Sequence, residues 1–303
     1  MPDPHGRTAS PERSLRVVQP GPLTTVQDLG RPGWAHLGVP RSGAADQVAH
    51  RLANRLVGNP EHVASLEITV GGLVVALECA VAIALTGARG SLRVNGRPRE
   101  WGTALSLGAG DLVEIGPFES GLRGYLAFSG GVDCPTVLGS RSTDLLSGLG
   151  PAPLGEGQEL RLGSAWGPPM EGTATQAPAR DVVRLVPGPR ADWFRASALG
   201  RLGSSAYVVE ADSNRIAVRL SGPKLNRIDE AQLPSEGLVL GSVQVPPNGQ
   251  PLVMLADHPV TGGYPVIGVV PAQDLALLAQ ARPGEPIRFS VVAGAEGATT
   301  GRR

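Results

Sequence analysis

The sequence predicts a mainly β protein with a few short helices, and three observations support this fold class. The 303 residues include 42 glycines and 28 prolines with only 4% aromatic residues, which is typical of a turn-rich globular chain. Between Ala64 and Gly163 short apolar runs such as LEITV, LVVAL, VAIAL and YLAF alternate with Gly, Pro, Asn and Asp, as strands alternate with turns. A faint repeat, Gly-polar-x-apolar-x-apolar, begins at Gly110, Gly157 and Gly284 and fits either turns entering strands or duplication of one barrel-like domain.

The length of the chain predicts about two domains of ordinary size. We expect a disordered leader over 1–13, an N-terminal β-barrel domain over 14–165, a linker over 166–180, a C-terminal β-barrel domain over 181–293 and a flexible tail over 294–303. The leader lacks the apolar run of a secretion signal. Cys79 and Cys134 form no disulfide framework, so we expect a cytoplasmic protein.

The first elements are a short strand at 15–19 and, after a polar segment, a helix. Ser42 is its expected N-cap, and Gly58-Asn59-Pro60 supplies the stop. The apolar stripe with i, i+3, i+4 spacing consists of Ala45, Val48, Ala49, Leu52, Ala53 and Leu56. The residues then expected to face outward are His50, Arg51, Asn54 and Arg55.

The stretch from Gly71 to Ala88 is apolar enough to raise the question of a membrane span. Glu78 interrupts it, and the runs 73–77 and 81–85 have the length of strands, so we expect a buried hairpin. Asn95-Gly96 predicts a two-residue hairpin turn, because both turn positions favour positive φ. Later strands are expected at 182–186, in the runs AYVVE, IAVRL, LVLGSVQV, PLVMLA and PVIGVV, and at 287–292, with a helix over 272–282.

Several classes of chemistry lack their sequence signals. Lys+Arg and Asp+Glu balance at 27 each, so no net charge would attract nucleic acid or an anionic membrane. The single lysine, Lys224, is followed by leucine, so the chain has no P-loop for ATP. Lys224 also lacks the flanking methionines that are usual around a biotinylated lysine, so the chain shows no biotin attachment site of that kind. His36, His50 and His62 have no ligand-pair spacing, and CxxC, HExxH and GxSxG are absent, so the sequence indicates neither a metal site nor a nucleophile elbow.

The segment from Gly21 to Asp46 is the first candidate site. Charged and hydroxyl side chains alternate there with glycines and prolines, which can order a loop without helix or strand. These side chains belong to Asp28, Arg31, His36, Arg41, Ser42 and Asp46. An ordinary long surface loop is the alternative interpretation.

Three more loops carry groups suited to an anionic ligand. An arginine fork binds carboxylate or phosphate in a bidentate way, although a surface salt bridge is the commoner role of any one arginine. The residues concerned are Arg141 and Ser142 in the second loop, Arg215 in the third, and Asp257, His258, Thr261, Gly262, Gly263 and Tyr264 in the fourth, whose Gly-Gly amides suit an oxyanion. Glu67 lies between apolar residues and is either a carboxyl with a raised pKa for acid/base work or the partner of an arginine. Glu236 and Gln244, beside strands, are further candidates to line a site.

Several motifs together resemble the biotin-dependent carboxyltransferase-like family that includes the C subunit of 5-oxoprolinase. They are TTVQDLGRPGWAHLGVPRSGAADQVAHRLANRLVGN, LTGA, GYLAFSGG, LGSRST, SEGLVLGSVQVPPNGQPLVMLADHPVTGGYPVIGVV and ARPGEPIRF. Members are also labelled allophanate hydrolase subunit 2 or kinase-inhibitor antagonist, and they resemble the carboxyltransferase part of urea carboxylase. The resemblance covers about Leu15 to Val292.

This resemblance implies two cyclophilin-like β-barrel domains and an assembly with two partners, a kinase-inhibitor-like B component and a hydantoinase-like A component of 5-oxoprolinase. The assembly would open 5-oxoproline to glutamate with ATP, which suits a chain that has no nucleotide loop. The allophanate hydrolase label fits poorly, because the lysine-serine signature of that amidase is absent. The chain departs from the family pattern at Ala217, where a glycine is usual, and at His258-Pro259-Val260, where Arg-Gln-Thr is usual.

The leading hypothesis is a subunit of an ATP-dependent 5-oxoprolinase complex, with the substrate in a cleft formed with the B component. The predicted catalytic residues are Asp28, Arg31, Asp46 and Asp257. The predicted substrate-binding residues are Arg41, Ser42, Glu67, Arg141, Ser142, Arg215, Thr261, Gly262, Gly263 and Tyr264. The alternatives are a biotin-dependent carboxyltransferase for a urea-like substrate and a non-catalytic antagonist that binds a kinase inhibitor.

Overall fold

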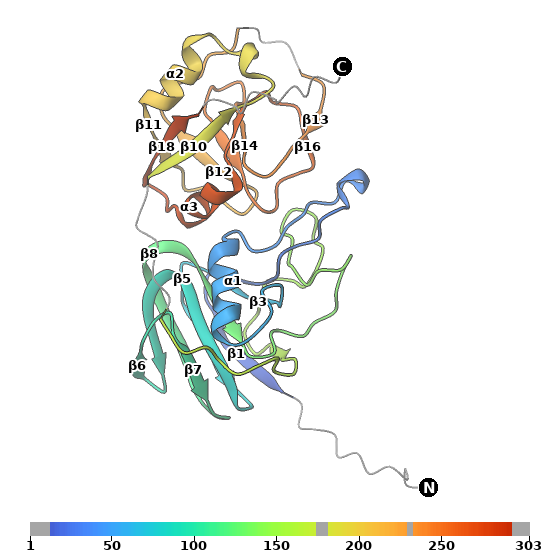
Figure 1. Ribbon diagram of the computed structural model, residues 1–303, viewed down its shortest axis with the longest axis vertical. Helices are drawn as coiled ribbons and strands as arrows, with labels where there is room; N and C mark the ends of the chain where they lie inside the picture. Colours follow the sequence, from blue (N-terminus) through green and yellow to red (C-terminus); the bar gives the residue numbers. More distant parts are fainter. Residues whose placement is uncertain (1–12, 174–180, 229–232, 293–303) are drawn as a thin grey trace, which may run out of the picture.

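The computed structural model describes residues 13–173, 181–228 and 233–292. Two β units stack along the long axis of the molecule, an N-terminal sheet and a C-terminal barrel, and helix α1 (Gln47–Leu56) lies against the sheet with one end toward the barrel (Figure 1). The predicted fold class, mainly β with two barrel-like domains, is confirmed. The leader up to residue 12, the linker from 174 to 180 and the tail from 294 lie outside the described residues, and the exact domain boundaries stay a prediction.

The N-terminal unit is one nine-stranded sheet in which two long strands do most of the pairing. Its strands are β1 (Ser14–Pro20), β2 (Leu23–Gln27), β3 (Ser65–Thr69), β4 (Leu73–Leu77), β5 (Val81–Val94), β6 (Arg97–Arg99), β7 (Ala104–Leu107), β8 (Leu112–Phe128) and β9 (Glu159–Arg161). The path runs β2-β3-β8-β4-β1-β9, and β5 pairs with β6, β7 and β8. Three register shifts between β5 and β8 mark bulges, which bend both strands so that the sheet curls around its apolar core.

The apolar stretch from Gly71 to Ala88 forms strands β4 and β5, as predicted. The expected hairpin between them is wrong, because β4 and β5 pair with β8 on its opposite edges and not with each other. Strand β8 is 17 residues long and pairs with β5 along one edge and with β3 and β4 along the other, and no local signal in the sequence reveals this. Among the described residues no helix is long and apolar enough to cross a membrane.

The predicted turn at Asn95-Gly96 is confirmed. Val94 of β5 pairs with Arg97 of β6, and the two turn residues have φ of 51° and 72°. Both values lie in the left-handed region, where Gly and Asn are favoured, so this dipeptide fixes the register of the hairpin.

Helix α1 begins four residues later than predicted. Its N-cap is Asp46, whose side chain accepts a hydrogen bond from the backbone of Ala49, and Ser42 lies in the preceding loop. The expected outward direction of His50 and Asn54 is also wrong, because both side chains are fully buried against strand β3 and the loop before it. The apolar side of α1 packs on β5 and β8 through its alanines.

The C-terminal unit is a closed barrel in the order β10-β17-β14-β15-β12-β11-β18. Its strands are β10 (Val182–Pro187), β11 (Ala206–Val209), β12 (Ala217–Ser221), β14 (Ser242–Gln244), β15 (Leu252–Met254), β17 (Val266–Val269) and β18 (Pro286–Val291). A separate ribbon pairs β13 (Glu236–Gly237) with β16 (Thr261–Gly262). The remaining elements are helices α2 (Ser197–Ser204) and α3 (Leu275–Gln280) and the 3-10 turns η1 (Ala35–Leu37), η2 (Ala191–Trp193) and η3 (Ala272–Asp274).

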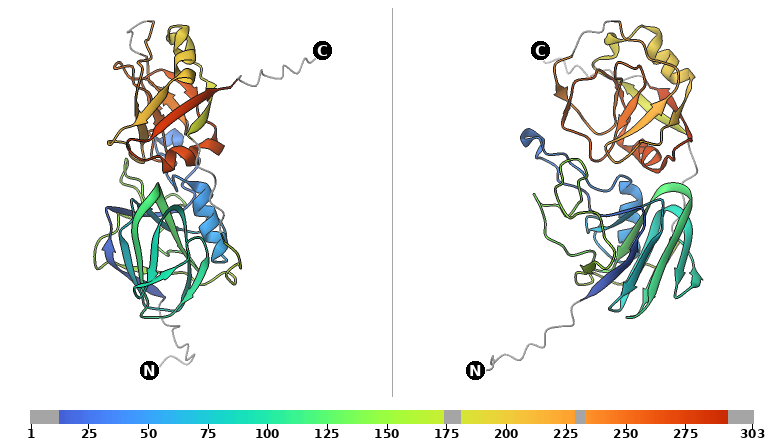
Figure 2. Two further views of the ribbon diagram at one scale, coloured as in Figure 1. Left: turned by 90° about the vertical axis from the view of Figure 1, so that its left-hand side faces the viewer. Right: turned by 180° about the vertical axis from the view of Figure 1, so that it is seen from behind.

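Helix α3 lies on the side of the barrel that faces the N-terminal sheet, as both views of Figure 2 show. Gln280, at its end, accepts hydrogen bonds from the backbone amides of Leu122 and Arg123 and donates to the carbonyl of Arg123. The predicted helix over 272–282 is therefore present as η3 followed by α3, and its last turn joins the two domains.

The buried His50 predicts that stability depends on pH. Its Nδ1 donates to Ser65 Oγ and its Nε2 accepts from Asn54, so the ring is neutral, and burial lowers its pKa from 6.5 to about 4. Because the unfolded chain then binds the proton more readily, the stabilisation is complete above pH 6.5 and is lost as pH falls toward 4. The loss amounts to about 3 kcal/mol. Urea unfolding at several pH values measures it. His50→Asn should flatten the profile in this range, and His36→Asn, at an exposed position, is the control; equal profiles for all three proteins would contradict the assignment.

Candidate functional site

Arg215, two residues before the start of β12, lies at the centre of the contact between the two domains and is 1% exposed. Its Nε and Nη2 each donate to Asp257 at 2.9 Å. Its Nη1 donates to Glu67 of the N-terminal sheet at 2.5 Å, and Nη2 also donates to the carbonyl of Gly43 at 2.7 Å. One guanidinium therefore joins two carboxylates and one backbone carbonyl, two of them in the N-terminal domain.

Glu67 is ion-paired, which is one of the two alternatives that its sequence context allowed. Burial would raise the pKa of Glu67, but the charges of Arg215 and Arg123 outweigh it and hold the pKa below its ordinary value. The second carboxylate oxygen accepts from Tyr125 at 2.8 Å and from the amide of Ala45 at 2.9 Å. The expectation of a raised pKa for acid/base work at Glu67 is therefore wrong.

Ser42, in the Gly21 to Asp46 segment, joins the hydrogen-bond network of Arg215 and Asp257. Its hydroxyl lies 2.8 Å from Asp257 Oδ1 and 2.9 Å from the carbonyl of Thr143, and its amide donates to the carbonyl of Ala256 at 3.1 Å. Ser42 has a φ of 55°, a value that non-glycine residues rarely adopt. The tertiary contacts on both sides hold this backbone in place.

Asp28 and Arg31 anchor the 137–144 loop. Asp28 accepts from the hydroxyls of Ser140 and Ser142 at 2.7 Å and 2.6 Å and from the amide of Arg141 at 2.6 Å. Arg31, 1% exposed, donates to the carbonyls of Ser142 and Val137 and forms a buried ion pair with Asp144. The side chain of Arg141 points away from this cluster and pairs with Asp133 at 2.8 Å.

Asp46 connects α1 to the C-terminal domain. Besides capping the helix, it accepts a hydrogen bond from Gln280 at 2.9 Å. Burial raises the pKa of this carboxyl, and the hydrogen bonds from Gln280 and the helix amides oppose the rise. The domain contact thus includes several buried or half-buried polar side chains that are hydrogen-bonded across it, among them Glu67, Arg215, Asp46 and Gln280.

A pocket of about 110 Å³ opens between the two domains, next to this network. It lies between the start of α1 and the η3–α3 turn, whose positions Figure 1 shows. Its lining consists of Arg41, Ser42, Ala44, Ala45, Gln47, Val48, Leu240, Ala256, His258, Ala272, Leu275 and Ala276. Small apolar side chains from both domains form most of the wall, with a few polar groups among them, as in small-molecule sites.

Three of the lining residues, Arg41, Gln47 and His258, have side-chain hydrogen-bonding capacity that no described part of the chain uses. The guanidinium of Arg41 makes no hydrogen bond or ion pair with any part of the chain that the structure describes. His258 lies 2.7 Å through Nδ1 from the carbonyl of Pro259, which can only accept, so Nδ1 carries the proton. Burial lowers the pKa of His258. Its Nε2 is therefore a free acceptor at neutral pH.

The structure brings together some of the predicted site residues and separates others. Arg215, Asp257, Glu67 and Ser42 form one buried cluster, and Asp28, Arg31 and Ser142 form another. The residues outside the pocket lining include Arg141, Thr261, Gly262, Gly263 and Tyr264. The roles predicted for all these residues stay predictions.

The polar lining of the pocket was only partly recognisable in the sequence. Arg41 and Ser42 were predicted to bind substrate, whereas Gln47 was missed and His258 was named only as a member of the fourth loop. The position of His258 beside Asp257, ahead of a Gly-Gly pair, was the available signal.

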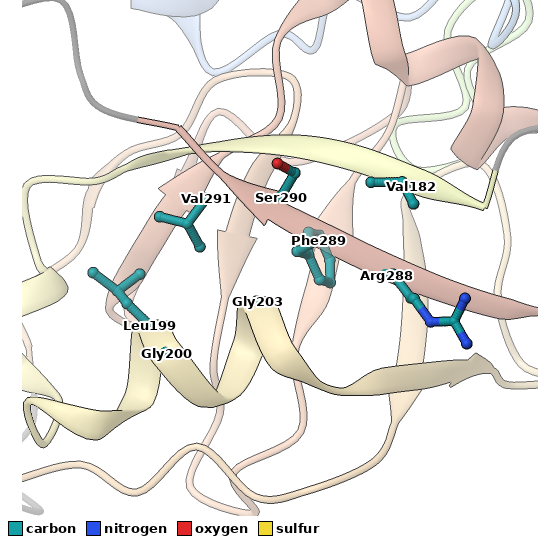
Figure 3. A pocket seen from close by; sticks show the side chains of 8 residues that line it. All are labelled: Val182, Leu199, Gly200, Gly203, Arg288, Phe289, Ser290 and Val291. Carbon is teal, nitrogen blue, oxygen red and sulfur yellow. The ribbon is translucent and has the colours of Figure 1, made fainter.

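A larger hollow, of about 540 Å³, lies on the outer surface of the C-terminal barrel. Helix α2 and strand β18 border it, with Leu199, Phe289 and Val291 along its sides (Figure 3). Its one charged lining residue, Arg288, is paired with Asp181 at 2.9 Å. Since this hollow offers no unpaired ionisable group, the interdomain pocket is the candidate site. Within the described ranges no group of three or more His, Cys, Asp or Glu side chains could hold a metal ion.

Comparisons with known proteins agree with the architecture. The sequence model of the carboxyltransferase domain, subdomain A and B, matches residues 37–291. The chain is 39% identical over 279 residues to the C subunit of 5-oxoprolinase from Escherichia coli, covering 91% of this chain and 90% of that protein. It is 32% identical to urea amidolyase of Lachancea kluyveri, covering 91% of this chain and 17% of that protein.

The crystal structure of TTHA0988 superimposes with a TM-score of 0.84 at 37% identity. It covers 93% of this chain, and this chain spans only 56% of that longer one. The same fold is therefore a part of some relatives and nearly the whole of another.

The Arg215 cluster predicts a large loss of stability on removal of its cation. Arg215→Ala leaves the carboxylates of Glu67 and Asp257 buried without their main partner, and breaking a buried pair in this way costs about 3–5 kcal/mol. Urea unfolding measures the loss. The matched control is Arg219→Ala, whose pair with Asp212 is exposed and should contribute less than about 1 kcal/mol. Equal losses in the two variants would contradict a central role for Arg215.

Proposed function

The chain belongs to the carboxyltransferase domain family, and we propose that it is a subunit of a 5-oxoprolinase-type enzyme that opens 5-oxoproline to glutamate. The name and near-complete coverage of the Escherichia coli relative support this proposal. In this proposal the B and A components of the complex bind ATP and supply further catalytic groups, since the sequence of this chain has no P-loop. The chain's part is to bind and orient the substrate.

The unpaired Arg41 at the interdomain pocket is the observation that carries the proposal. A guanidinium fork suits one carboxylate, and 5-oxoproline has one carboxylate on a small ring. The pocket volume of about 110 Å³ is smaller than the cavity of about 150 Å³ that holds benzene, so a small ring with one carboxylate would lie partly in the open mouth of the pocket. Pockets for drug-sized ligands measure about 300–1,000 Å³, so neither a nucleotide nor a biotin arm fits inside this one.

The reaction requires little of this chain beyond positioning. The lactam C–N bond breaks, the carbonyl carbon gains the oxygen of water and becomes a carboxylate, and the nitrogen gains protons and becomes an ammonium group. Arg41 holds the carboxylate already present. Asp257 and Ser42 hold the backbone next to Arg41, because Ser42 follows it directly and is bonded to Asp257. Acid/base groups from a partner complete the site.

A carboxyltransferase acting on a urea-like substrate is the second candidate. The match to urea amidolyase favours it, and Arg41 would then hold the transferred carboxyl group. This function requires a biotin carrier and a biotin carboxylase as partners. Binding to a kinase inhibitor without catalysis is a third candidate, which loss of activity on pocket substitutions would contradict.

Reconstitution tests the leading proposal. The purified chain with its B and A partners should release glutamate from 5-oxoproline in the presence of ATP, and omission of this chain should abolish the release. Glutamate is measured by coupled oxidation with glutamate dehydrogenase. Unchanged release without this chain would refute the proposal. Release that avidin blocks would favour the biotin-dependent alternative.

Arg41→Ala tests the carboxylate contact. A hydrogen-bonded charge pair of this kind contributes about 1.5–3 kcal/mol, so kcat/KM should fall about 10- to 100-fold. The melting temperature should stay unchanged, because Arg41 makes no hydrogen bond or ion pair with the described residues. The control is Arg97→Ala, another exposed arginine, on β6. Equal activity in both variants would place the carboxylate elsewhere.

A further inference from the structure

His258 gives the interdomain pocket a second, uncharged recognition group. It is 6% exposed, it lines the pocket, and its Nε2 has no hydrogen-bond partner among the described residues. The bond from Nδ1 to the carbonyl of Pro259 fixes the tautomer and the orientation of the ring. An acceptor that the protein leaves unpaired at the wall of a pocket can bind a ligand that brings a donor.

The charged side chains next to His258 are already paired within the protein. Asp257, the preceding residue, is held by two bonds from Arg215, and Arg215 also pairs with Glu67. Arg41 is the one cationic side chain in the pocket lining. The pocket therefore contains one free positive charge, one neutral acceptor and the amide of Gln47, which can donate or accept.

Arg41 and His258 together match one kind of ligand. A compound with one carboxylate and one neutral N–H group satisfies both Arg41 and His258. A dicarboxylate of similar length brings a second negative charge, for which the pocket lining has no cation, and burying an unpaired charge is costly. A ring that carries oxygen in place of N–H presents a lone pair to the lone pair of Nε2 and leaves it unsatisfied.

We propose that His258 is a specificity-determining residue, which selects a monocarboxylate with a ring N–H over its lactone isostere and over the ring-opened dicarboxylate. The inference rests on the proposed function and extends it. The substrate is bound through its lactam N–H, and the product, glutamate, is released because its new carboxylate has no partner in the pocket.

Calorimetric titration at pH 7.5 tests this without catalysis, on the full chain and on its complex with the partner proteins. The probes are 5-oxoproline, its lactone isostere 5-oxotetrahydrofuran-2-carboxylate, and glutamate. 5-Oxoproline should bind about tenfold or more tightly than either of the other two. Equal affinity for the lactam and the lactone, or no binding of any probe to chain or complex, would overturn the inference.

Two substitutions at His258 form a matched pair. His258→Asn keeps a donor near the Nδ1 position and removes the Nε2 acceptor, so the preference for lactam over lactone should fall to about one. His258→Gln places near the Nε2 position an amide that can accept from the lactam or donate to the lactone, so it should keep affinity for the lactam and gain affinity for the lactone. Arg41→Ala should weaken the lactam and the lactone equally. A preference that persists in His258→Asn would remove His258 from this role.

The outcome separates this inference from the proposed function. Lactam selectivity without glutamate release by the reconstituted complex would refute the 5-oxoprolinase proposal and leave the role of His258 intact. Glutamate release without lactam selectivity would refute the role of His258 alone. Melting temperatures of the variants show that each measurement is made on folded protein.

Discussion

The ion cluster around Arg215 is the interaction on which the rest of the structure depends. Removing a guanidinium and two carboxylates from water is expensive, and good geometry with additional hydrogen bonds must offset the cost. Here Tyr125, the amide of Ala45 and the carbonyl of Gly43 supply those bonds. Because Glu67 and Gly43 belong to one domain and Arg215 and Asp257 to the other, the bonds from Arg215 to Glu67 and Gly43 form only when the domains are docked. The cluster therefore stabilises one relative position of the domains.

The docked position in turn shapes the loop that carries Arg41. The segment from Gly21 to Asp46 forms a loop whose two ends meet at Gly30 and Gly43. A Cβ at Gly30 would lie 2.5 Å from the carbonyl oxygen of Arg41, and a Cβ at Gly43 would lie 2.7 Å from the amide nitrogen of Gly30. Both have positive φ, so glycine is required for space and for conformation. The arginines at 31 and 41 differ in their environments. Arg31 is buried where the two ends of the loop meet. Arg41, at the mouth of the pocket, has no hydrogen-bond or ion-pair partner for its guanidinium among the described residues.

The sequence predicts the local features of this fold well, because strand runs and the Asn95-Gly96 turn depend on neighbours. It fails where the partner is distant. His50 and Asn54 lie on the polar side of the α1 pattern, yet Ser65 and the carbonyl of Val63 satisfy them in the interior. Arg215 and Glu67 are 148 residues apart, so no spacing rule joins them. Five of the twelve lining residues are alanines, which have no chemical signature, and only Arg41 and Ser42 were predicted to bind substrate.

A pocket whose walls come from both domains makes ligand binding and domain docking thermodynamically linked. Leu240, Ala256, His258 and α3 contribute one side, and the residues from Arg41 to Val48 contribute the other. A ligand that bridges Arg41 and His258 binds only the docked form, so it stabilises that form by mass action. Conversely, weakening the Arg215 cluster reduces the fraction of chain competent to bind and lowers affinity without touching the pocket. The buried charges that carry no ligand contact therefore control the site through the population of the docked state.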